Sequence, residues 1–126
     1  MITPAYRAAK FIAETIQSVQ AQTYPDFEML IVDDCSPDET AAVVARFAAE
    51  DPRIRLLRQS VNGGPAAARN RALMEARGRW IAFLDSDDLW LPEKLCRQLA
   101  FHRATDAALT YTAFRRISSD GSRLGR

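Results

Sequence analysis

The sequence predicts an α/β protein with a three-layer α/β/α architecture and a mainly parallel sheet. Three observations predict this fold class. Helical periodicity alternates with short apolar runs, the helical stretches are roughly ten to fifteen residues long, and two apolar runs end in aspartates. Such alternation is typical of right-handed βαβ units. With 126 residues, 48% of them hydrophobic, we expect one folded domain over residues 1–126.

The first half of the chain supplies two helices around a strand. Apolar residues at three- and four-residue steps predict a helix over 8–22, and a nearly continuous apolar run predicts a strand over 27–33 that is buried on both faces. Ser36 and Glu39 have the spacing of a capping box, so we expect the next helix to begin at Ser36 as its N-cap. This helix should end near Asp51.

The second half continues the alternation of strands and helices. A breaker cluster at 62–65 precedes an Ala-rich stretch, and later apolar runs are separated by polar turns. We expect, in order, a strand over 54–58, a helix over 65–77, a strand over 80–84, a helix that opens at Pro92, a strand over 107–114 and a polar tail over 118–126.

Aspartates follow two of the predicted strands. Asp34 ends the first acidic group, and Asp85, Asp87 and Asp88 form the second. Ligands of parallel sheets bind beyond the carboxyl ends of the strands. We therefore expect the two acidic groups to share one crevice, although they lie far apart in the sequence.

The second acidic group places three carboxylates within four residues. Their mutual repulsion would be relieved by a hard divalent cation, Mn or Mg, that keeps sites open for phosphate oxygens. Asp87 and Asp88 are the first candidates for metal ligands. The alternative that these residues only cap the following helix stays open.

Asp34 is the candidate that contacts a nucleotide base. Neighbouring strand residues point to opposite faces, so only one of Asp33 and Asp34 addresses the crevice, where a carboxylate can accept the ring N–H of a uracil. A turn or capping role is the alternative. The glycines at 63–64 favour anions at a helix start, and Arg69 either contacts a diphosphate or pairs with Glu75.

Composition excludes several classes of protein. A formal charge of +1 gives no field that favours nucleic acid, and the longest apolar runs are too short to span a membrane. Two cysteines indicate a reducing cytoplasm, with peripheral attachment at the inner face of a membrane left open. A phosphorelay receiver domain is an alternative α/β reading, but it needs a late strand-end lysine, and the last lysine, Lys94, lies on a predicted helix.

An ordered set of motifs over Thr3 to about Leu99 resembles family 2 glycosyltransferases. The motifs are Thr3-Pro4-Ala5-Tyr6, Gln22-Thr23-Tyr24-Pro25-Asp26-Phe27-Glu28, Ile31-Val32-Asp33-Asp34, Asn62-Gly63-Gly64, Ala68-Arg69-Asn70 and Asp85-Ser86-Asp87-Asp88. The resemblance implies a Rossmann-like GT-A fold and the donor-binding half of an inverting, metal-dependent enzyme of bacterial cell-envelope polysaccharide biosynthesis. Such an enzyme transfers a sugar from a nucleotide-diphosphate sugar, commonly a UDP-sugar, to an acceptor that the sequence does not identify.

The resemblance also assigns site residues. It implies that the donor nucleotide contacts Pro4, Ala5, Tyr6, Asp34, Arg69, Asp85 and Asp87, and that Asp87 and Asp88 hold the divalent metal. Tyr6 would stack near the base. The catalytic base is expected in a second half that this chain does not match, so we assign none.

The chain departs from the family pattern at several positions. Arg7 replaces the usual Asn and Cys35 the usual Gly, and the Cβ of Cys35 disfavours a left-handed backbone there. Only Met1 to Thr3 remain of a first strand that is usually central. We therefore expect a gap in the sheet, a misplaced start at Met1 and a truncated domain, with an inert nucleotide-binding fragment as an alternative to an active enzyme.

Overall fold

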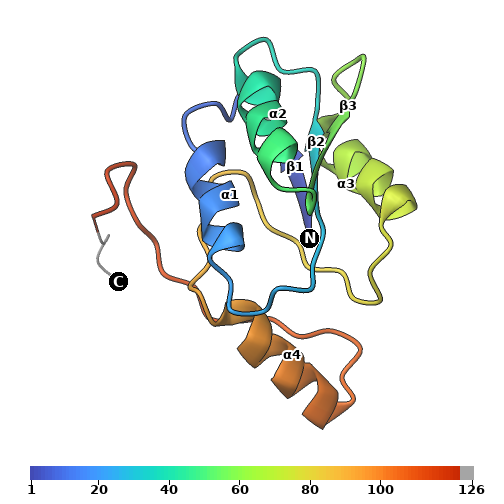
Figure 1. Cartoon of the computed structure of the whole chain (residues 1–126), viewed down its shortest axis with the longest axis vertical. Coiled ribbons are helices and arrows are strands. Elements are labelled where there is room, and N and C mark those ends of the chain that lie inside the picture. Colours follow the sequence, from blue (N-terminus) through green and yellow to red (C-terminus); the bar gives the residue numbers. More distant parts are fainter. Residues whose placement is uncertain (123–126) are drawn as a thin grey trace.

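The computed structural model describes residues 1–122 of the chain. Strands and helices alternate along the sequence before a final helix (Figure 1). The elements are β1 (Ile2–Ala5), α1 (Ile12–Gln20), β2 (Met29–Asp33), α2 (Thr40–Glu50), β3 (Ile54–Arg58), α3 (Gly64–Glu75) and α4 (Lys94–Thr105). The four helices therefore confirm the helical predictions to within a few residues. The last four residues of the predicted polar tail lie outside the described part.

The sheet has three parallel strands in the order β1-β2-β3. On its free side β1 also meets the chain near Phe83, because the Ile2 amide donates to the Ala82 carbonyl at 2.9 Å and the Leu84 amide donates to the Ile2 carbonyl at 3.1 Å. The first strand thus forms and lies between β2 and the 82–84 segment. The expected gap at this position in the sheet is wrong, because four residues suffice to pair with β2.

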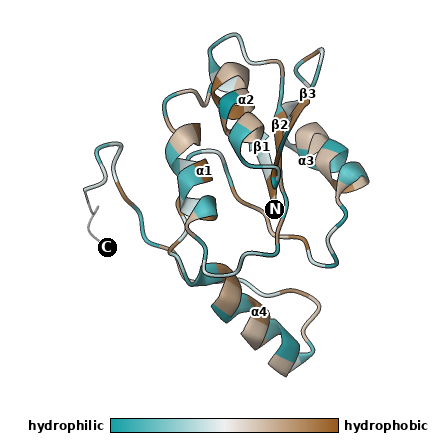
Figure 2. Ribbon diagram, in the orientation of Figure 1, coloured by the Kyte–Doolittle hydropathy of each residue, from teal (hydrophilic) through white to brown (hydrophobic). Residues whose placement is uncertain are grey.

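Helices cover both faces of the sheet, which confirms the three-layer architecture. One apolar core joins α1 and α2 to residues such as Ile31, and a second joins Leu30 and Val32 to the small residues Ala68 and Ala72 of α3. Figure 2 shows the hydrophobic colouring concentrated in the central strands, with mixed colouring on the helices. All five residues of β2 are buried, as a strand covered on both faces requires.

The predicted start of α2 at Ser36 is wrong. The helix begins at Thr40, and the Ser36 hydroxyl instead accepts a hydrogen bond from the Arg7 amide at 3.1 Å. Asp38 takes over the turn, since its carboxylate accepts from the Thr40 amide at 3.1 Å. The sequence offered two short polar residues for this role, and contacts with the loop after β1 decide between them.

Two predicted strands do not form within residues 1–122. Over 80–84 the structure has only the isolated bridge between Phe83 and Ile2, and over 107–114 it has no regular structure. Both segments have strand-like apolar patterns, but a strand exists only where neighbouring backbone supplies hydrogen-bond partners. Figure 1 shows the chain between α3 and α4 rising beside β1 and then turning back toward α4, which lies apart from the sheet.

Within the described part of the chain, the helices are all too short or too polar to cross a membrane.

Candidate functional site

The two acidic groups end at the same edge of the sheet. Ile2 pairs with Leu30 on one side and bridges to Phe83 on the other, so Leu30 and Phe83 are level. All these segments run parallel, which brings Asp34 and Asp85 to the carboxyl edge with β1 between them. Strands in a sheet are about 4.8 Å apart, so the two segments are separated by roughly 10 Å.

Asp34 is 2% exposed and clamps the start of α3. Its Oδ1 accepts the Gly63 amide at 2.8 Å, and its Oδ2 accepts the Gly64 amide at 2.7 Å. The carboxylate therefore occupies the anion-binding end of a helix, where charge-assisted bonds from free backbone amides are strong. The capping role that the sequence left open for Asp34 is realised, and contact with a base stays a prediction.

Gln59 is a site residue that the sequence analysis missed. Its side-chain Nε2 donates to Asp34 Oδ1, and its backbone amide donates to the Asp33 carbonyl at 2.9 Å. Gln59 directly follows β3, whose last residue pairs with Asp33. The rule that neighbouring parallel strands end at one edge would have found it.

Asp33 points to the opposite face of the sheet from Asp34, as strand alternation predicts. It is 2% exposed and lies on the same face as Ile31. Within residues 1–122, its Oδ1 has no hydrogen-bond partner. Of the two carboxylates, it is Asp34 that faces the glycine loop.

Cys35 adopts a left-handed backbone with φ of 59°. The expectation that its Cβ would prevent this conformation is wrong, and Arg7 is also left-handed with φ of 51°. Both residues stand where the family pattern has residues suited to positive φ. The loops around Ser36 and Asp38 hold them there, since the Arg7 and Ala9 amides bond to those side chains at 3.1 and 3.3 Å.

Arg69 connects α3 to the second acidic group. Its Nη2 donates to Asp85 Oδ1 at 2.8 Å, whereas Glu75, the other partner considered, pairs with Arg71 and Arg55. Arg69, Phe83, Asp85 and Asp88 line a small open hollow. One helix thus holds Asp34 at its start and Asp85 beside its second turn.

The second acidic group forms a turn fixed from both sides. The Asp88 amide donates to the Asp85 carbonyl at 3.2 Å, and the Thr15 hydroxyl of α1 donates to the Ser86 carbonyl at 3.0 Å. Partial burial of the Asp88 carboxyl group, and then the neighbouring Asp87 and Asp85 carboxylates, raise the pKa of Asp88. Repulsion of this kind suits a cation, although among residues 1–122 no three acidic, His or Cys side chains already converge as a metal cage.

Pro4, Ala5 and Tyr6 lie at the end of β1, between the two acidic groups. Ala5 is buried, and its carbonyl accepts the Asp34 amide at 2.9 Å, so only its backbone and Cβ lie near the edge. Tyr6 is 44% exposed, with the Arg7 guanidinium 5.3 Å from its ring centre. An exposed aromatic ring beside Asp34 is placed where a planar base could stack on it.

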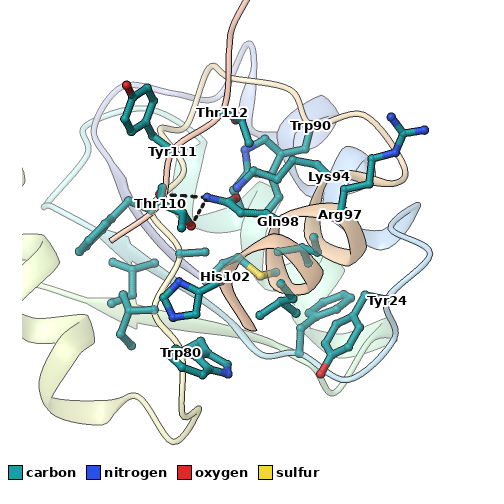
Figure 3. A pocket seen from close by; sticks show the side chains of 18 of the residues that line it. Tyr24, Trp80, Trp90, Lys94, Arg97, Gln98, His102, Thr110, Tyr111 and Thr112 are labelled. Atoms are coloured by element: carbon teal, nitrogen blue, oxygen red, sulfur yellow. Dashed lines mark hydrogen bonds between the residues drawn. The ribbon is translucent and has the colours of Figure 1, made fainter. Parts of the chain in front are cut away.

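A second, larger hollow opens at the opposite edge, around α4 (Figure 3). Gln98 donates to the Thr110 carbonyl at 3.0 Å, the Trp80 and His102 rings meet edge-on at 4.3 Å, and Lys94 lies 3.5 Å from the Trp90 ring centre. Burial lowers the pKa of Lys94 to about 8. Aromatic rings dominate this hollow, which lacks the acidic turn of the carboxyl edge.

The fold and this edge define a parallel α/β domain whose glycine loop, arginine and aspartates suit a phosphorylated ligand. The model of the glycosyl transferase family 2 matches residues 1–126, and the chain belongs to this family. The putative teichuronic acid biosynthesis glycosyltransferase TuaG of Bacillus subtilis (strain 168) is 42% identical over 126 residues, which are all of this chain and 50% of that protein.

Solved structures share the GT-A fold. The S. aureus TarS 1–349 structure in complex with UDP superposes with a TM-score of 0.77 and 35% identity, over 83% of this chain and 32% of that one. The mannosyltransferase PcManGT from Pyrobaculum calidifontis, in complex with GDP-Man and Mn2+, gives a TM-score of 0.75 and 31% identity, over 80% of this chain and 31% of that one. The chain therefore spans about half of TuaG and a third of these two structures.

Proposed function

We propose that this chain binds the nucleotide-diphosphate sugar donor of a glycosyltransferase, with a UDP-sugar as the donor and a divalent metal at the diphosphate. The observation that carries the proposal is the attachment of both acidic groups to α3, through the bonds of Asp34 to the helix start and the 2.8 Å pair of Arg69 with Asp85. TarS with UDP and PcManGT with GDP-Man and Mn2+ support the class of ligand.

Each candidate residue has a role that suits its position. Tyr6 stacks on the base, Asp34 accepts a base N–H, and the Pro4–Ala5 backbone borders this pocket. Arg69 and Asp85 lie next to the diphosphate, where the planar guanidinium can shift from carboxylate to phosphate oxygens. Asp87 and Asp88 hold Mn or Mg, which when bound supplies Lewis-acid stabilisation of the departing diphosphate.

Glycosyl transfer by the whole protein follows from family membership, and the acceptor and the inverting mechanism remain part of the proposal. TuaG is named for teichuronic acid biosynthesis, which supports a role in cell-envelope polysaccharide synthesis at the cytoplasmic side. An inert nucleotide-binding fragment is the competing function for these 126 residues. Binding of the donor nucleotide decides between the two.

Calorimetric titration with UDP, with and without Mn2+, tests the proposal. We expect the Asp34→Asn variant to bind UDP about tenfold more weakly under both conditions, because a charge-assisted hydrogen bond is lost. The Asp87→Asn variant should bind more weakly only when Mn2+ is present. Asp26→Asn, an exposed change in the loop before β2 at the opposite edge, is the matched control and should leave binding unchanged. No heat from the unsubstituted chain with UDP and Mn2+ would support the inert fragment.

A further inference from the structure

The Asp34 carboxylate is already covered by donors from its own chain. Gly63 and Gly64 donate backbone amides at 2.8 and 2.7 Å, and Gln59 adds a side-chain N–H to Oδ1. A carboxylate has about four lone-pair positions, so one position remains, on Oδ2. With the residue only 2% exposed, that position is not open to a large ligand.

The three donors differ in how easily they can leave. The glycine amides belong to the start of α3, where the left-handed Gly64 (φ 81°) fixes the turn, so displacing them would unwind the helix end. Gln59 contributes only a flexible side chain from a half-buried position. Within residues 1–122, its carboxamide makes no hydrogen bond other than that to Asp34. Gln59 is therefore the cover that can turn away at the lowest cost.

The Gln59 carboxamide also has the chemistry of the predicted ligand. A uracil ring presents an N–H next to carbonyl oxygens, and a carboxamide presents an N–H next to one carbonyl oxygen. Both donate to a carboxylate in the same way.

We infer that the Gln59 side chain is an internal placeholder for the nucleotide base at Asp34, and that it turns away when a base with a ring N–H binds. The inference rests on the proposed function of Asp34. In the free protein Gln59 satisfies Asp34 and keeps water from it, and on binding one N–H donor replaces another. Gln59 is thus a positioning residue that sets the affinity of the base pocket.

A UDP titration with Mn2+ distinguishes this role from a purely structural one. Gln59→Met keeps the length of the side chain and removes its N–H donor, so it should tighten UDP binding, on the order of tenfold, because the competing hydrogen bond is gone. A merely structural Gln59 would give weaker binding. Gln98→Met is the matched control, because Gln98 bonds to Thr110 in the hollow of Figure 3 and should not affect UDP.

A second measurement on the unsubstituted chain keeps the inference testable if Gln59→Met folds poorly. The side-chain amide signals of Gln59 in a 15N-resolved NMR spectrum should move toward those of a solvent-exposed glutamine as UDP is added, while those of Gln98 stay in place. Unmoved Gln59 signals in a chain that binds UDP, or UDP affinity of Gln59→Met that is equal or weaker, would overturn the placeholder and leave the proposed function intact. Absence of UDP binding in every variant would overturn both.

Discussion

Single residues at the carboxyl edge are held against their intrinsic preferences. Cys35 and Arg7 adopt φ of 59° and 51°, values that a side chain with a Cβ disfavours. Each lies directly after a strand end, where the chain must turn sharply before its next helix. The sequence identified both positions as departures from the family pattern, but the surrounding contacts that impose positive φ are visible only in three dimensions.

Replacing Cys35 by Gly should increase the free energy of unfolding by about 1 kcal/mol, because glycine adopts positive φ without the Cβ penalty. Urea unfolding at neutral pH measures this change. Cys35→Ala is the matched control, since it also removes the exposed thiol but keeps the Cβ, and it should give no stabilisation. Equal effects of Gly and Ala would show that backbone strain at this residue is negligible.

Replacing Asp34 by Ala should lower the free energy of unfolding by about 2–3 kcal/mol, because it leaves the Gly63 and Gly64 amides without their acceptor. Hydrogen exchange at these two amides should also accelerate, which locates the effect at the start of α3. Asp26→Ala is the control for removal of an exposed aspartate. Unchanged exchange at both glycines would contradict the clamp.

At the level of elements, the sequence predicted what local patterns determine. All four helices and the strands β2 and β3 carry clear apolar periodicity, and each forms close to its predicted bounds. Elements that depend on partners were predicted less well. The 80–84 and 107–114 runs look like strands but lack a full neighbouring strand within residues 1–122, whereas the short β1 forms because β2 pairs with it.

The same distinction applies to the candidate site. The strand-end rule located Asp34 and the 85–88 turn from the sequence, since it needs only the order of elements. The pairing of Arg69 with Asp85 and the cover of Asp34 by Gln59 depend on side-chain placement across elements. Local patterns carry no information about such contacts.

Asp51 joins three elements and should make stability depend on pH. The Arg53 guanidinium, and then the Gln20 amide of α1, hold the pKa of Asp51 well below its usual range. A depressed carboxyl pKa stabilises the fold above the unfolded pKa of about 3.9, and this contribution is lost as pH falls through the folded value. Asp51→Asn should therefore cost about 2 kcal/mol at pH 7 and flatten the fall in stability below about pH 4.

Urea unfolding of both proteins between neutral and acid pH measures this difference. Asp26→Asn should retain the full pH dependence of the unsubstituted chain. A parallel fall of stability in Asp51→Asn and the unsubstituted chain below pH 4 would contradict the assignment.

For the whole molecule, the distribution of apolar surface is uneven. Ten of the fourteen large apolar side chains that are exposed lie between Trp80 and Ile117, and only Leu95 of α4 is buried. Patches of this kind promote association or dye binding in a soluble protein. The α1–β–α3 body is covered on both faces, so the two ends of the molecule differ in character.

The chain as given should therefore self-associate as its concentration rises. The double substitution Leu109→Ser and Phe114→Ser, at side chains 80% and 86% exposed, should reduce this association in sedimentation velocity. Met74→Ser on α3, where the side chain is also 86% exposed but lies outside the patch, should have little effect. Equal reduction by both changes would indicate that the patch is not the contact surface.

An NMR titration of the 15N-labelled chain with UDP in the presence of Mg2+ tests most directly whether the two acidic groups serve one ligand. The account predicts that amide signals of Tyr6, Asp34 and Asp87 move together along a single binding curve, while the α4 signals stay in place. Movement of only one acidic group, or separate curves with different dissociation constants, would contradict it.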